Sequence, residues 1–233
     1  MRISYNNLLK NATIVATNEV ANYPATNLYH VWKKKLFKAS ATTSQITVTF
    51  SEISSISSVC LAEHNLTECT VEFYDTTDTL IDTWTLDTSF KFEAVYGDIS
   101  DCKKAIVNAT SLSDVEIGLL YIGDSIYSGI EAENSIPLSS NDNVLASTDR
   151  QISGKRGSST REATVTIPLL SSDERKEIEA CYYSCGLIIP FILDLWNSSH
   201  SEFEPVYCVF TSDLDVTHPA SGDKVSFSIK EAN

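Results

Sequence analysis

The chain has 233 residues, with 31 Asp and Glu against 17 Lys and Arg, so its formal net charge is −14 at pH 7. This charge repels phosphate backbones and anionic lipid, and no stretch reaches the roughly twenty apolar residues of a membrane span, so the sequence argues against nucleic-acid and membrane binding. The globular composition excludes disorder as the main state, and the length allows one large β domain or two smaller ones.

Residues 1–125 carry the pattern of half-buried strands. Apolar and polar residues alternate in "QITVTF", "TVEFYD", "SFKFEAV" and "DVEIGLLYIGD", and turn-forming clusters such as "DTTDT" and "GDISD" separate these runs. The spacing predicts an antiparallel β-sandwich over residues 1–125. Its expected interior is Ile46, Val48, Phe50, Leu61, Phe73, Trp84, Ile117 and Leu119.

Residues 126–160 are polar, contain Pro137, Gly154 and Gly157, and keep only scattered apolar side chains. They are predicted to form an extended arm or linker that is mobile in the isolated protein. Basic side chains here stand out in an acidic chain and are candidates for docking on an acidic surface of a neighbouring subunit. These are Arg150, Lys155, Arg156 and Arg161.

Residues 161–233 predict a small α+β unit with one helix among several strands. Ser171 followed by Glu174 fits a capping box, and Gly186 can end the helix. The helix should bury Ile178, Cys181 and Cys185. The run "LIIPFILDLW", residues 187–196, is expected to be the most buried strand of this unit. The fold class is therefore mainly β.

The six cysteines form no CxxC pair and no zinc-like set with histidine. We expect them to be reduced, buried and free of metal, and we expect no cofactor. They are Cys60, Cys69, Cys102, Cys181, Cys185 and Cys208.

The pair His64–Asn65, at the end of an apolar strand, has two interpretations. A catalytic role would need a nearby nucleophile, yet the four histidines are isolated in sequence and no GxSxG motif occurs, so we expect no enzyme activity. The favoured interpretation is a loop lock, in which the Asn amide bonds turn backbone and the His donates to a carbonyl. Trp32, beside "KKK", is the candidate for stacking on a sugar.

Several segments resemble a family of tailed-phage structural proteins. "NYPATNLYHVWKKK", "ITVTFSEISSISSVCLAEHNLTECTVEFYD" and "EIGLLYIGDSI" are similar to the discoidin-like, galactose-binding-like jelly roll of that family, and the C-terminal stretch is similar to its second part. The most distinctive segments run from Tyr23 to Leu28 and from Ala62 to Leu66, and Ala62 itself departs from the family pattern. The resemblance implies a jelly roll, a virion tail component and no enzyme activity.

Two functional hypotheses follow. The first is a structural protein of a phage tail, near the tail tip or baseplate, made in the host cytoplasm. It would assemble in several copies, and with other tail proteins, through the arm and the C-terminal unit. The alternative is a carbohydrate-binding module that recognises host surface glycans with loops near Trp32, His64 and Asn65.

Overall fold

The computed structural model describes residues 1–30, 34–127, 133–135, 138–140, 143–146, 152–155, 159–194, 205–218 and 222–232. It divides into two compact units. The sandwich unit consists of Arg2–Ile126 and Ile192–Val206, and the C-terminal unit consists of Met1, Tyr127–Phe191 and Tyr207–Ala232. A late segment of the chain thus belongs to the unit that the early residues build.

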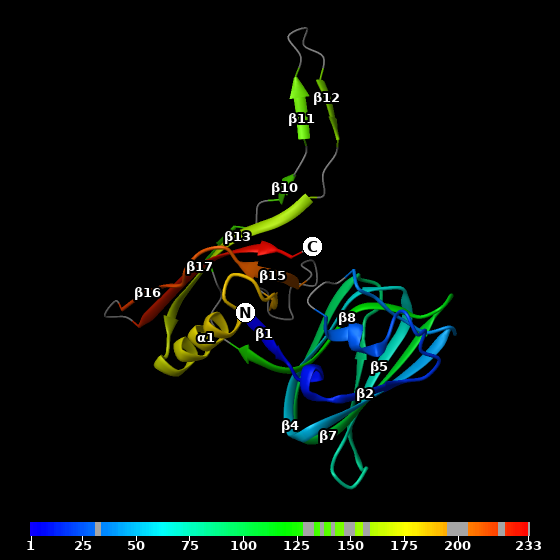
Figure 1. The fold of residues 1–233 in the computed structure, drawn as a ribbon. Coiled ribbons are helices and arrows are strands. Elements are labelled where there is room, and N and C mark those ends of the chain that lie inside the picture. The colour runs from blue at the N-terminus through cyan, green and yellow to red at the C-terminus, as the bar shows by residue number, and fades with distance from the viewer. Residues whose placement is uncertain are drawn as a thin grey trace. The chain divides into compact units, whose positions relative to one another are not determined.

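The sandwich unit is built from antiparallel strands and two short 3-10 helices (Figure 1). Its sheet order is β14-β1-β8-β4-β7-β5-β6, while β2 pairs with β4 and β3 pairs with β8. The elements are β1 (Arg2–Asn7), η1 (Leu8–Asn11), β2 (Thr13–Ala16), η2 (Ala25–Tyr29), β3 (Phe37–Lys38), β4 (Thr43–His64), β5 (Leu66–Tyr74), β6 (Leu80–Leu86), β7 (Phe92–Ser111), β8 (Glu116–Tyr127) and β14 (Phe191–Asp194).

Two long strands give the sandwich its layers. Figure 1 shows β4 and β7 as curved strands that run side by side. Their register shifts between Thr49 and Ser58, so each strand bends there and contributes to both layers. The cluster "GDISD", predicted as a turn, lies within β7, where Asp101 adopts a φ of 57°. The predicted turn is therefore wrong.

The predicted interior of the sandwich is confirmed. All eight residues are buried, and Phe73 packs against Trp84 in an edge-to-face pair with ring centroids 4.8 Å apart. One residue of the alternating runs lies elsewhere: Phe90 is 39% exposed, in the turn before β7, although Phe92 is buried. The alternation begins one step later than predicted because the strand starts at Phe92.

The C-terminal unit is a smaller sheet with one helix. Its strand order is β10-β13-β17-β15, with β9 on β13, β16 on β17, and β11 paired with β12 in a hairpin. The elements are β9 (Glu133–Ser135), β10 (Leu138–Ser140), β11 (Asn143–Ala146), β12 (Ile152–Lys155), β13 (Ser159–Leu170), α1 (Ser172–Cys185), β15 (Val206–Phe210), β16 (Asp215–Thr217) and β17 (Asp223–Glu231).

The helix α1 begins and ends as predicted. Ser171 and Glu174 form the capping box, and the Gly186 N–H donates to the Tyr182 carbonyl with Gly186 at a φ of 53°. The predicted inner face is confirmed, because Ile178, Cys181 and Cys185 are buried.

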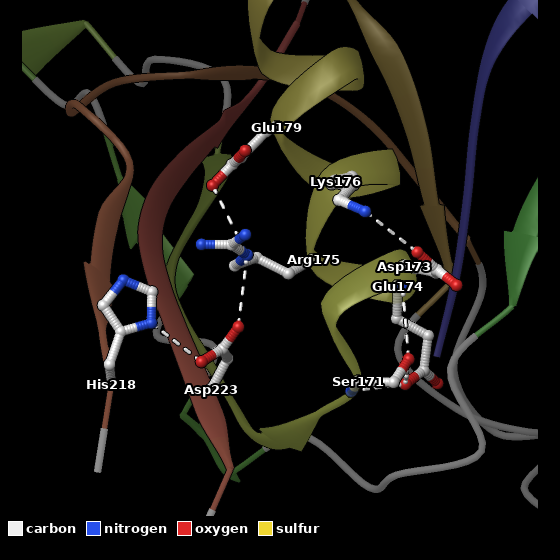
Figure 2. A network of polar contacts seen from close by, with 8 residues as sticks. All are labelled: Ser171, Asp173, Glu174, Arg175, Lys176, Glu179, His218 and Asp223. Atoms are coloured by element: carbon white, nitrogen blue, oxygen red, sulfur yellow. Dashed lines mark hydrogen bonds and ion pairs between the residues drawn. The ribbon is translucent and has the colours of Figure 1, made fainter.

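A charged network ties α1 to the sheet. Figure 2 shows Arg175 of α1 between Glu179 and Asp223, with its Nε 3.1 Å from Asp223 Oδ2. The other oxygen of Asp223 contacts His218 Nδ1 at 2.8 Å. The bond to His218, followed by the charges of His218 and Arg175, holds the pKa of Asp223 below its ordinary value of 3.8.

The prediction for residues 187–196 is wrong in extent and place. Leu187 and Ile188 are exposed and precede the strand, which begins only at Phe191. Its residues Ile192–Asp194 belong to the sandwich unit, where they pair with β1. A continuous apolar run indicates burial but does not indicate which sheet will accept it.

About half of the predicted arm, residues 126–160, lies outside the described residues. Its described stretches form the short strands β9 to β12, and no side chain between residues 128 and 160 is described. Its mobility and its role as a strap stay predictions.

Candidate functional site

A hollow of about 380 Å³ lies on the sandwich unit. Its residues come from four separate stretches: the loop before β3, the end of β4, the residue before β7 and the first residue of β8. Within the described residues, its lining is Lys34, Leu36, Glu63, His64, Asn65, Lys91 and Glu116.

His64 closes the end of β4 through both nitrogens of its ring. The Leu66 N–H donates to Nδ1 at 3.2 Å, so Nε2 carries the proton and donates to the Phe90 carbonyl at 2.9 Å. Burial, and then the charge of Lys91, lower the pKa of His64 below its ordinary value of 6.5, although the bond to Phe90 opposes them. The ring is therefore neutral at pH 7 and leaves no nitrogen free for proton transfer.

Asn65 fastens the neighbouring loop to this corner. Its Nδ2 donates to the Asp114 carbonyl at 2.7 Å and to Ser113 Oγ at 3.1 Å, while its Oδ1 accepts the Glu116 N–H at 2.9 Å. These partners lie about fifty positions later in the chain. The loop-lock interpretation of His64 and Asn65 is thus confirmed, whereas their contact with a ligand or partner stays a prediction.

Two hydrogen bonds connect Lys91 to the end of β4, one to Glu63 and one to His64. The Glu63 N–H donates to the Lys91 carbonyl at 2.8 Å, and Lys91 Nζ donates to the His64 carbonyl at 2.7 Å. Glu63 has a φ of 53°, a left-handed conformation that costs a non-glycine residue about 1–2 kcal/mol. Such strain is characteristic of positions whose side chain is placed for function.

Some of the described charged groups around the hollow form an ion pair and others do not. Glu116 forms an ion pair with Lys38, and this bond is the main cause that raises the pKa of Lys38. Lys38 also lies over the Tyr23 ring, 4.9 Å from its centroid. Within the described part of the chain, Lys34 and Lys91 form no ion pair.

Most of the other predicted contact residues cannot be placed, because they lie outside the described part of the chain. Trp32, Arg150 and Arg156 lie outside the described residues, and only the backbone of Lys155 is described. Arg161 lies in β13 of the C-terminal unit, half-buried, with its N–H donating to Glu231 Oε2. The sequence indicated the corner at His64 and Asn65 but not the four charged residues of the described lining, which are Lys34, Glu63, Lys91 and Glu116.

Those four residues carried little signal in the sequence. Lys91 and Glu116 come close to His64 only because strand pairing folds the chain back on itself. The pairing of β4 with β7 begins at Phe92, directly after Lys91, and its pairing with β8 begins at Ile117, directly after Glu116. Lys34 belongs to the "KKK" run, which the sequence marks only as the neighbour of Trp32.

The described residues offer little for a metal or a reactive thiol. Nowhere among them do three or more His, Cys, Asp or Glu side chains gather in a way that could hold a metal ion. All six cysteines are buried and none is in a disulfide, and burial raises the pKa of Cys60 and Cys69 to about 12 and that of Cys102 to about 11. No described helix has the length and apolar character needed to cross a membrane.

Comparison with known proteins finds likeness only among solved structures. No family model matches the chain, and no curated protein matches it. A His 62 mutant of the lectin binding domain of Lectinolysin, complexed with Lewis b, is similar over 52% of this chain and 96% of its own, with 9% identity and a TM-score of 0.45. A fucose binding module of Streptococcus pneumoniae shares 9% identity over 51% of this chain and 95% of its own, with a TM-score of 0.44. The family 32 CBM from C. perfringens NanJ, in complex with galactose, shares 14% identity over 52% of this chain and 98% of its own, with a TM-score of 0.43.

Proposed function

We propose that the sandwich unit binds a saccharide in the hollow. The observation that carries this proposal is the lining itself: of its seven described residues, six are polar or charged and one, Leu36, is apolar. A volume of about 380 Å³ lies within the range of roughly 300–1,000 Å³ that small-molecule sites occupy. Such sites combine apolar surface with a few placed polar groups, and the ammonium and carboxylate groups of this lining suit a ligand rich in hydroxyl groups.

The available groups match what sugar hydroxyls need. A hydroxyl both donates and accepts, lysine ammonium groups only donate, and carboxylates only accept. The hollow offers both kinds, through Lys34 and Lys91 and through Glu63 and Glu116. The bonds of His64 and Asn65 fix the backbone beneath them before any ligand arrives, which lowers the entropy cost of binding.

A steric variant tests this proposal without changing any charge. We expect the wild-type protein to bind at least one member of a panel of immobilised oligosaccharides, and Leu36→Trp, which fills the hollow, to abolish that binding. Leu112→Trp is the matched control, because Leu112 is 91% exposed and outside the lining. Absence of binding to every saccharide, or unchanged binding by Leu36→Trp, would contradict the proposal.

A second candidate function is the structural role in a phage tail. The observation that favours assembly is an apolar patch on the C-terminal unit, formed by Tyr183, Leu187, Ile188 and Ile189. Ile188 is 83% exposed, and the Ile189 N–H donates to the Cys185 carbonyl, which holds the segment against the end of α1. Clustered exposed apolar residues are typical of surfaces that another protein covers.

Under this second candidate, the patch contacts further copies of the chain or other tail proteins, and the protein is located in the virion tail. The predicted strap with Arg150, Lys155, Arg156 and Arg161 would add contacts to an acidic neighbour. Sedimentation velocity tests the assembly: the wild-type protein should form oligomers as concentration rises, and Ile188→Ser should remain a monomer. Ile53→Ser is the matched control, because Ile53 is 55% exposed on the sandwich unit. A monomeric wild-type protein, or equal assembly by Ile188→Ser, would refute the role of the patch in self-assembly.

A further inference from the structure

We infer that the hollow selects acidic saccharides, with the sugar carboxylate bound by Lys34 and Lys91. This inference rests on the proposed saccharide binding and adds the chemical class of the ligand. It follows from the charges that remain uncompensated once the ion pairs around the hollow are taken into account.

The acidic side of the hollow is already partly neutralised. Glu116 is paired with Lys38, and the charge of Asp114 also acts on Lys38. Glu63 is the other carboxylate among the described lining residues. An anionic ligand therefore meets less repulsion here than the net charge of −14 would indicate.

The basic side of the hollow is uncompensated. Among the described residues neither Lys34 nor Lys91 forms an ion pair. Lys91 uses one of its three N–H groups on the His64 carbonyl, at 2.7 Å, and this bond positions the ammonium group while leaving two donors.

The ring of His64 does not compete for the ligand's charge. It is neutral at pH 7 and both of its nitrogens are bonded to backbone groups. Recognition of a carboxylate thus depends on the two lysines. Charge-assisted bonds from an ammonium to a carboxylate are roughly twice as strong as bonds to a neutral hydroxyl, so a uronic acid should bind more tightly than the corresponding hexose.

Matched sugar pairs test the inference directly. Galactose with galacturonate, and glucose with glucuronate, differ at C6 only, where a carboxylate replaces the hydroxymethyl group. We expect the wild-type protein, followed by calorimetry and NMR titration, to bind the acid of at least one pair about tenfold more tightly, which corresponds to about 1.4 kcal/mol. The preference should shrink as salt is raised, because ions screen exposed charges.

The variants Lys34→Gln and Lys91→Gln should each reduce the preference to about twofold or less. They should weaken binding of the neutral hexose less than binding of the acid, because the hexose loses a bond to a neutral hydroxyl and the acid loses a charge-assisted one. Lys103→Gln is the matched control, since Lys103 Nζ also donates to a backbone carbonyl, that of Ser51 at 2.7 Å, but lies outside the lining. It should keep the full preference.

The possible results separate this inference from the proposed function. If acid and hexose bind equally, and Leu36→Trp abolishes both, the saccharide proposal stands and the acidic preference is wrong. If no sugar binds, both fail. Competition by acetate or sulfate as effective as by the uronic acid would show a simple anion site and would also overturn the inference.

Discussion

The hollow of the sandwich unit and the apolar patch of the C-terminal unit are opposite kinds of surface, and they are held in opposite ways. The hollow is charged, and its shape depends on side chains that bond to backbone 26 and 49 positions away, as His64 does to Phe90 and Asn65 to Asp114. The patch is apolar and lies on a helix end fixed by local bonds, such as that of Ile189 to Cys185.

Because the two surfaces are held differently, different substitutions should destabilise them. A surface held by long-range bonds should fail when a single polar side chain or a core contact beneath it changes. A surface held by a capped helix should lose stability in small local steps.

The largest expected effect comes from Gly97→Ala in the sandwich unit. A Cβ at this position would lie 2.3 Å from Cζ2 of the buried Trp84 ring, so the core must shift. We expect a loss of about 3 kcal/mol in the free energy of unfolding, measured by denaturant titration. Adding Trp84→Leu should make the Gly97→Ala change much less costly. If Gly97→Ala lowers the stability equally with and without Trp84→Leu, the Trp84 ring is not the cause of the loss.

The next effect comes from Asn65→Ala, which removes the lock. The Asp114 carbonyl and the Glu116 N–H lose their partner, and because water can reach them the expected loss is about 1–2 kcal/mol. Saccharide binding should weaken as well, because the hollow loses its fixed loop. Asn108→Ala is the control, because the side-chain amide of Asn108 bonds to two other side chains, those of Gln45 and Glu72. This substitution should lower the free energy of unfolding by less than about 0.5 kcal/mol. If Asn65→Ala and Asn108→Ala lower the free energy of unfolding equally, the lock has no special role in stability.

The corresponding change in the C-terminal unit is Ser171→Ala, which removes half of the capping box. We expect a loss of about 1 kcal/mol, because the Glu174 N–H loses its acceptor. Ser171→Asp should restore most of the stability. Binding in the hollow should be unaffected, and a weakened affinity would show that the two surfaces are coupled.

The stability of the protein should depend on pH in two windows, an upper one from His64 and a lower one to which Asp223 contributes. The pKa of His64 is lowered in the folded state, so the unfolded state takes up its proton first and stability falls as pH drops below about 6.5. The pKa of Asp223 is also lowered, so its contribution is present above 3.8 and is lost as pH falls further through the folded value.

Thermal unfolding followed between pH 7 and pH 3 measures both windows. His64→Gln, whose amide can donate and accept in place of the ring, should flatten the upper window and leave the lower one. Asp223→Asn should leave the upper window and reduce the lower one only in part, because the pKa values of Asp75, Asp87 and Glu174 are also lowered. An upper window that persists in His64→Gln would assign it to another group.

Features that depend on residues close together in the chain could be predicted from the sequence alone. Strict alternation placed Ile46, Val48 and Phe50 inside because side chains of a strand point to opposite faces in turn. The helix cap at Ser171 was predictable because its partner, Glu174, lies three positions away. The local chemistry of the pair His64–Asn65 indicated a lock, although not the groups that it bonds.

The tertiary structure decided everything that depends on contacts between distant residues. It placed Lys91 and Glu116 beside His64, and it assigned Ile192–Asp194 to the sandwich unit while leaving Leu187 and Ile188 exposed. The sequence could not fix these outcomes, because an apolar run or a lone charge carries no record of the strand that will pair beside it. The candidate site is therefore a product of strand pairing, and the fold class a product of local pattern.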